Sequence, residues 1–232
     1  MPGTINLESL KLVNEKIATA AKKSGRVKTD VQIVAVTKTF PLSAIESAIS
    51  AGISCIGENR VQEIKDKLTD FNKPPQSEFH FIGHLQSNKV RKVLQYMDVI
   101  ETVDSLKLAN KIANVSADTA KKTSVFLQIN TGNDPAKHGF SPDRALHAAE
   151  KISNLENLSL DGVMTIPPFV QDENILAPLF EKTRQLRDEI LKKINPSCKN
   201  LSMGMSGDFE LAIEHGATHI RLGTILFGSR VK

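Results

Sequence analysis

A lysine at the end of an apolar run is the first residue in this sequence whose type and position suggest chemistry. Lys38 ends the segment IVAVTK. When burial partly removes water from a lysine amine, the neutral form becomes accessible, and it attacks an aldehyde to form a Schiff base. A solvated lysine at a strand end has the same position, so the other residues of the site must decide between these two interpretations.

Two glycine-rich turns near the C-terminal end have the composition of a phosphate site. The first contains Ser206 and Gly207 in MGMSGD, and the second contains Gly223 and Thr224 in RLGT. Glycine allows the backbone to approach a ligand closely, and backbone N–H groups at the start of a helix, which we expect near Ser206, bind anions. Glycines also make ordinary tight turns, so either turn alone is weak evidence for phosphate.

Eight short apolar segments, rich in β-branched residues, predict the strands that must position these groups. Between them, apolar residues recur every three or four positions, as they do along the buried face of a helix. Such alternation predicts a parallel sheet, either an open doubly wound sheet or a closed (β/α)8 TIM barrel. The count of eight and the length of 232 residues favour the barrel, which typically has about 250. The predicted strands are residues 31–37, 55–57, 79–83, 98–103, 124–130, 160–166, 200–204 and 219–223.

We expect one α/β domain over residues 1–232, with a leading helix at about 1–28 and the barrel at 31–230. The leading helix would cover the lower end of the barrel. Chemistry in such barrels occurs at the C-terminal ends of the strands, and the loops after strands seven and eight often bind phosphate. Lys38 would end the first strand, while the two glycine-rich turns follow the seventh and eighth. The sequence thus predicts an aldehyde-reactive amine and a phosphate site at one mouth.

The composition is that of an ordinary globular protein. Lysine and arginine number 30 against 26 acidic residues, a net charge of +4, with no basic run of the kind that binds nucleic acid. Two cysteines, Cys55 and Cys198, cannot form a disulfide framework and indicate a reducing compartment. No segment has the ~20 apolar residues of a membrane span, and the N-terminus lacks the apolar region of a secretory signal. We expect a cytoplasmic location, with an organellar pool also compatible, and neither nucleic acid nor a membrane as partner.

Five segments of the sequence resemble the pyridoxal phosphate (PLP) homeostasis protein family. They occur in the family's order between about residues 7 and 230, and they are VAVTK, GENRVQE, FHFIGHLQSNK, INTGNDPAKHGF and LSMGMSGDFELAIEHGATHIRLGTILFG. That family is similar in turn to the barrel domain of alanine racemase and ornithine decarboxylase, fold type III of PLP proteins. The resemblance implies PLP as the cofactor and a monomeric protein.

The resemblance also implies which residues surround the ring of PLP. Lys38 would form the Schiff base, and Asn59, in GENRVQE, would lie beside the ring. Arg221 would face the pyridine nitrogen. His84 and Met203 would line the pocket.

The phosphate of PLP would be held, by the same resemblance, by Ser206 and Gly207 together with the backbone of Gly223 and Thr224. Lys137, in DPAKHGF, could be a second docking point for PLP or part of a partner surface. An exposed loop lysine without a special role is the ordinary alternative for Lys137.

An arginine at the ring nitrogen argues against demanding carbanion chemistry. Arginine has only hydrogen-bond donors, so it would hold the nitrogen unprotonated and weaken the ring as an electron sink. Alanine racemase works with such an arginine, but with a tyrosine contributed through a further domain as second acid/base. The only tyrosine here, Tyr96, precedes the fourth predicted strand and therefore lies away from Lys38. His84 could substitute, although a histidine at a strand end is more often a pocket wall.

We therefore expect a protein that is not an enzyme. It would hold PLP on Lys38 and hand it over to apo-enzymes, releasing it by hydrolysis or by exchange with free amino acids. Three alternatives stay open: a low-activity PLP-dependent amino-acid racemase or decarboxylase, a Schiff-base aldolase acting on a phosphorylated sugar, and an interaction scaffold. Aldolase lysines occur on later strands of the barrel, which counts against the second of these.

Overall fold

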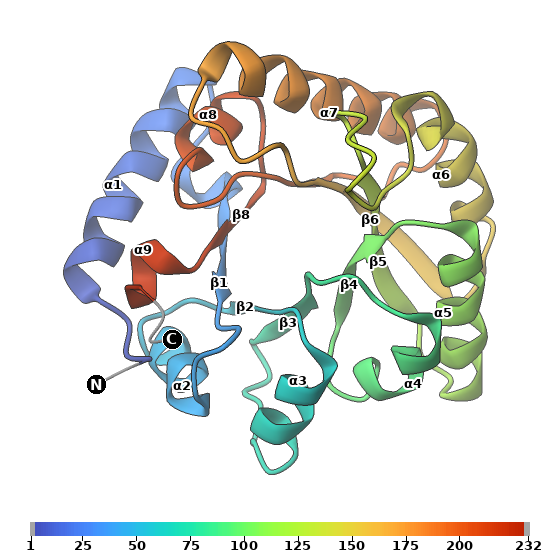
Figure 1. Cartoon of the computed structure of the whole chain (residues 1–232), viewed down its shortest axis with the longest axis horizontal. Helices are drawn as coiled ribbons and strands as arrows, with labels where there is room; N and C mark the ends of the chain where they lie inside the picture. Colours follow the sequence, from blue (N-terminus) through green and yellow to red (C-terminus); the bar gives the residue numbers. More distant parts are fainter. Residues whose placement is uncertain (1–2, 230–232) are drawn as a thin grey trace.

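Eight parallel strands form a closed barrel in the computed structural model, which describes residues 3–229. The strands pair in chain order, and β8 pairs with β1 to close the barrel (Figure 1). The predicted (β/α)8 architecture is therefore confirmed. The strands are β1 (Gln32–Val36), β2 (Cys55–Glu58), β3 (Glu78–Phe81), β4 (Val99–Val103), β5 (Thr123–Ile129), β6 (Leu158–Thr165), β7 (Asn200–Ser202) and β8 (His219–Leu222).

Helices surround the strands in a ring (Figure 1). Their buried faces and the outer faces of the strands form one continuous apolar core. The helices are α1 (Leu7–Lys23), α2 (Leu42–Ser50), α3 (Val61–Leu68), α4 (Val90–Val93), α5 (Leu106–Asp118), α6 (Ala145–Ser153), α7 (Glu173–Lys193), α8 (Phe209–Glu214) and α9 (Thr224–Phe227). Three short 3-10 turns precede β1, α4 and α6, at Lys28–Asp30, Ser87–Lys89 and Pro142–Arg144.

The leading helix α1 lies in the outer ring and not across the lower end of the barrel, where we expected it (Figure 1). It packs against α8 and α9, and the backbone amide of Asn6, which precedes it, donates to Leu226 O at 2.8 Å. The reason is that α9, the helix after β8, has only one turn. An apolar stripe on α1 covers the barrel wall that a full-length eighth helix would cover: Leu10, Val13, Ile17, Ala20 and Ala21.

The helix expected near Ser206 begins later, at Phe209. The Asp208 carboxylate accepts a hydrogen bond from Met205 N at 2.5 Å, and this bond closes a turn ahead of the helix. Ser206 and Gly207 therefore lie in a turn, and their amide groups are not part of a helix.

The interior of the barrel is unusually polar. Branched apolar residues usually fill it, but here His80, Glu101, Ser202 and Arg221, from four different strands, are buried and joined by hydrogen bonds. Beside them lie the aromatic and apolar side chains of Val99, Phe126 and Met164.

The organisation as one domain stays a prediction, and its outermost residues, 1–2 and 230–232, lie outside the described part of the chain. Among the helices of residues 3–229, none combines the length and the apolar character that crossing a membrane requires.

Candidate functional site

Lys38 lies where β1 ends, and a buried polar cluster fixes the backbone on both sides of it. Thr37 Oγ1 donates to Glu58 Oε1 at 2.7 Å, and Lys67 Nζ donates to Thr37 O at 2.9 Å. On the other side, Thr39 N donates to Glu63 Oε2 at 2.6 Å. Lys38 itself is half-buried. Strand β2 and helix α3 thus hold the turn that carries Lys38.

The centre of this cluster is a buried ion pair. Lys67 Nζ lies 2.7 Å from Glu58 Oε1, and the exposed fractions of the two side chains are 9% and 1%. Burial raises the pKa of Glu58 even though the charge and hydrogen bond of Lys67 act in the opposite direction. Thr39 has φ of +67°, a left-handed conformation that costs about 1–2 kcal/mol in an L-residue. The hydrogen bond from Thr39 N to Glu63 helps to hold this turn.

Asn59 follows β2 at the same end of the barrel, and its side chain carries an unsatisfied acceptor. Asn59 Oδ1 is buried and has no hydrogen-bond partner among residues 3–229. The loop after β3 packs closely against it, because a Cβ added to Gly83 would lie 2.3 Å from Asn59 O. Buried polar atoms are nearly always hydrogen-bonded, so an orphaned oxygen at the mouth fits a donor supplied by a ligand.

Arg221 is buried below the mouth, with a fixed orientation. Its guanidinium donates to Ser202 Oγ at 2.7 Å and to Thr165 O at 2.9 Å. Ser202 Oγ in turn donates to Glu101 Oε2 at 2.6 Å, and His80 Nδ1 lies 2.7 Å from Glu101 Oε1. The hydrogen-bonded chain His80–Glu101–Ser202–Arg221 thus spans the interior of the barrel.

The charges of this chain stabilise one another. Burial acts to raise the pKa of Glu101, but the hydrogen bond from His80 and the charge of Arg221 lower it to about 2. Desolvation acts to lower the pKa of His80, yet hydrogen bonds with Cys55, Glu101 and Glu78 hold it well above its ordinary value. Burial lowers the pKa of Arg221, which still stays charged because guanidinium is so basic.

The two glycine-rich turns meet at the mouth. Arg221 N donates to Gly204 O at 2.9 Å, which joins the end of β8 to the turn after β7. Gly204 has φ of +92°, and a Cβ there would lie 2.6 Å from Ala212 Cβ, so only glycine allows this close packing. Four backbone amides in these turns have no acceptor within the described residues: those of Ser206, Gly207, Gly223 and Thr224.

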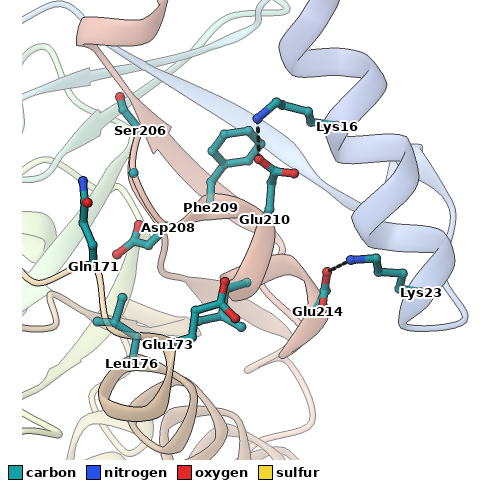
Figure 2. Close-up of a pocket in the computed structure, with 12 residues that line it drawn as sticks. Lys16, Lys23, Gln171, Glu173, Leu176, Ser206, Asp208, Phe209, Glu210 and Glu214 are labelled. Atoms are coloured by element: carbon teal, nitrogen blue, oxygen red, sulfur yellow. Dashed lines mark hydrogen bonds and ion pairs between the residues drawn. The ribbon is translucent and has the colours of Figure 1, made fainter.

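A cavity of about 370 Å³ lies behind the first of these turns, between α1, the start of α7 and α8 (Figure 2). Both of its lysines are paired, Lys16 with Glu210 at 2.6 Å and Lys23 with Glu214 at 2.7 Å. Two further carboxylates, Glu173 and Asp208, also line it. This excess of negative charge disfavours a phosphate in the cavity, so an anion fits better on the amide side of the turns.

His84 lies at the rim of the mouth and Met203 below it. The His84 side chain is 45% exposed, its Nδ1 lies 3.0 Å from Asp104 Oδ2, and its ring stacks on that of His138 at 3.8 Å. Met203 is fully buried in the apolar core.

Two other residues singled out in the sequence lie as follows. Tyr96 precedes β4, at the opposite end of the barrel from Lys38, with its OH 3.5 Å from Thr69 Oγ1. Lys137 Nζ donates to Pro167 O at 2.8 Å, so this lysine bridges the loops after β5 and β6.

Sequence reasoning identified the residues at the strand ends but missed the groups that hold them. Glu58 and Glu63 are both in the GENRVQE segment, yet nothing in its spacing shows that they contact the turn of Lys38. For His80 and Glu101 a signal does exist: His80 lies between two phenylalanines within a strand, and Glu101 is the only charged residue of the VIETV segment.

The fold and the mouth together define a class of protein: barrels of the alanine racemase type with a lysine after the first strand. The family described as "Alanine racemase, N-terminal domain" matches residues 9–231. An alanine racemase of Clostridium difficile has the same fold, with a TM-score of 0.75 at 15% identity; the match covers 96% of this chain and 57% of the racemase.

Within this class, the chain belongs to the pyridoxal phosphate homeostasis protein family. It is 39% identical over 226 residues to the protein of that name from Vibrio cholerae, covering 96% of this chain and 95% of the relative. It also resembles the structure of PipY of Synechococcus elongatus with PLP bound, with a TM-score of 0.79 at 34% identity, covering 91% of this chain and all of PipY. The resemblance noted in the sequence is thereby confirmed.

The buried ion pair below Lys38 leads to a prediction about stability. Replacing Lys67 by Met leaves the Glu58 carboxylate buried without its cation, so we expect the free energy of unfolding to fall by about 3–5 kcal/mol. The control is Lys65→Met on the exposed side of the same helix, expected to change it by less than about 0.5 kcal/mol. Urea unfolding followed by circular dichroism measures both, and equal effects of the two substitutions would contradict the assignment.

Proposed function

We propose that this protein stores PLP as a Schiff base on Lys38 and hands it over to apo-enzymes. One observation carries the proposal: Lys38 and the four amides without acceptors lie at the same end of one barrel. An amine and an anion site at one mouth suit a phosphorylated aldehyde. The family name and the PLP in the PipY structure support PLP as that aldehyde.

In this proposal the two glycine-rich turns bind the phosphate. The Ser206 hydroxyl and the amides of Ser206, Gly207, Gly223 and Thr224 supply donors without a formal charge. Uncharged donors suit an anion that must also be released, because they bind it less tightly than the charged side chain of lysine or arginine would.

The ring of PLP would be held by Asn59 and Arg221. Asn59 Oδ1 is a buried acceptor for a donor on the ring, with His84 at the rim and Met203 beneath completing the pocket. The guanidinium of Arg221, fixed by Ser202 and Thr165, would donate to the ring nitrogen. PLP supplies an electron sink when that nitrogen is protonated, and an arginine, which has only donors, opposes protonation.

Handover follows from this arrangement. A Schiff base on a half-buried lysine is open to water and to visiting amines, so free amino acids or the lysine of an apo-enzyme can take over the aldehyde. The only tyrosine of the sequence lies at the other end of the barrel and cannot serve as acid/base at the mouth. We place this role in the cytoplasm, with a monomer as the active form.

The central test is covalent capture. We expect the protein mixed with PLP to absorb visible light as a Schiff base, and borohydride reduction to fix the adduct on Lys38, as peptide mass spectrometry reads out. Lys38→Ala abolishes the adduct, because the other amine near the end of β1, that of Lys67, is buried in its ion pair with Glu58. Lys137→Ala, which removes another mouth lysine, keeps it. An adduct on Lys137, or no absorbance from the unaltered protein, would refute the proposal.

The phosphate site is tested by comparing two ligands. Ser206→Ala removes one hydrogen bond to a charged group, which contributes about 1.5–3 kcal/mol, so we expect the Kd for PLP to rise about 10- to 150-fold. Pyridoxal lacks the phosphate, and its weaker binding changes by less than about twofold. Fluorescence titration measures both constants, and an equal loss of affinity for both ligands would show that Ser206 does not contact the phosphate.

The second candidate is a low-activity amino-acid racemase or decarboxylase, which the His84–Asp104 contact favours. An imidazole oriented by a carboxylate is the usual arrangement of a general acid/base. If the protein is such an enzyme, the PLP-loaded protein turns over single L-amino acids continuously, and His84→Asn abolishes this turnover. The storage proposal expects only stoichiometric exchange, and chiral chromatography of the amino acids distinguishes the two.

A further inference from the structure

Three strands begin with polar side chains that converge at the end of the barrel opposite to Lys38. Gln32, Cys55 and Glu78 are the first residues of β1, β2 and β3. Cys55 Sγ lies 2.9 Å from Gln32 Oε1 and 3.9 Å from Glu78 Oε2, and His80 Nε2 lies 3.2 Å from the same Glu78 oxygen. The proposed function uses none of these four groups.

We propose that Cys55, Glu78 and His80 bind a divalent cation of the zinc type. A thiolate, an imidazole and a carboxylate are the ligands that Zn²⁺ prefers, at about 2.0–2.3 Å in tetrahedral geometry. Ligand atoms on such a tetrahedron are about 3.2–3.8 Å apart. The distances from Glu78 Oε2 are close to this range, at 3.9 Å to Cys55 Sγ and 3.2 Å to His80 Nε2. The three donor atoms lie within 4.8 Å of one another.

The neighbouring groups are those that a metal site requires. A metal-ligating histidine nearly always donates its other ring N–H to a carboxylate, which fixes the tautomer. His80 Nδ1 has that partner in Glu101, at 2.7 Å, so Nε2 faces Cys55 and Glu78. Binding of the cation releases the protons of Nε2 and of the Cys55 thiol to water. The amide of Gln32, whose oxygen and nitrogen are interchangeable by a flip, can donate to the thiolate.

The cluster is buried on one side and open on the other. Cys55 is 2% exposed and His80 is fully buried, whereas the Glu78 side chain is 48% exposed and Gln32 is exposed. An ion can therefore enter from the base of the barrel and leave one position to water. Bound there, it would join the starts of β2 and β3.

A second group of possible ligands, His84, Asp104 and His138, lies at the mouth. It offers only nitrogen and oxygen donors, and both imidazoles are largely exposed. The sulfur of Cys55 separates the two groups experimentally, because only a thiolate gives a sulfur-to-metal charge-transfer band.

The test is titration of the full chain, free of tags and with its thiols reduced, with Co²⁺ as a coloured substitute for Zn²⁺. We expect one equivalent to give a sulfur-to-cobalt band in the difference spectrum, and Zn²⁺ to displace it. Cys55→Ser removes the band. Cys198→Ser keeps it, because that thiol is isolated and burial raises its pKa to about 12. His138→Gln keeps it as well.

The proposal fails if the unaltered protein gives no such band, if the band survives Cys55→Ser, or if Cys198→Ser or His138→Gln removes it. Should Cys55→Ser not fold, as circular dichroism would show, Glu78→Gln decides. Because the Glu78 side chain is half-exposed, we expect this substitution to leave the fold intact. We expect the Kd for Zn²⁺, measured in competition with a chromophoric chelator, to rise about tenfold or more. An unchanged Kd overturns the assignment. None of these measurements depends on PLP.

Discussion

The mouth of the barrel depends on a pair of opposite charges buried inside it. Arg221 and Glu101 are both buried and are bridged by the hydroxyl of Ser202. Removing each ion from water costs several kcal/mol, and only complete hydrogen bonding offsets this cost. Here every partner comes from a different strand, so the charges are satisfied only when β3, β4, β6, β7 and β8 are in register. The pairing of these strands in register therefore also fixes the orientation of the arginine.

The sequence predicted the strands well because a strand buried on both faces leaves a short, continuous apolar run. All eight runs correspond to strands, with boundaries that differ by at most two residues. It also predicted that the candidate residues share one end of the barrel, because parallel strands present all their C-terminal ends on one side. Lys38, Asn59 and the two glycine-rich turns lie there as expected.

Long-range contacts account for what could not be predicted. The stripe on α1 shows that one face is buried. Its position follows only from the structure, in which the helix after β8, α9, has a single turn. In the sequence, Lys67 has the features of an ordinary exposed helix lysine. Only the folded structure shows that it forms a buried ion pair with Glu58. A hydrogen bond from Met205 to Asp208 moves the start of α8 to Phe209, and spacing alone cannot reveal that bond.

The position of α1 has a consequence for folding during synthesis. Its partners α8 and α9 are the last helices of the described chain, so α1 contacts residues almost two hundred positions away, as in the ion pair of Lys16 with Glu210. Contacts of such sequence separation form slowly, and exposed apolar surface promotes aggregation in the meantime. A nascent chain leaving the ribosome carries this helix uncovered until α8 and α9 have been synthesised, so its apolar face is exposed to other molecules during that time.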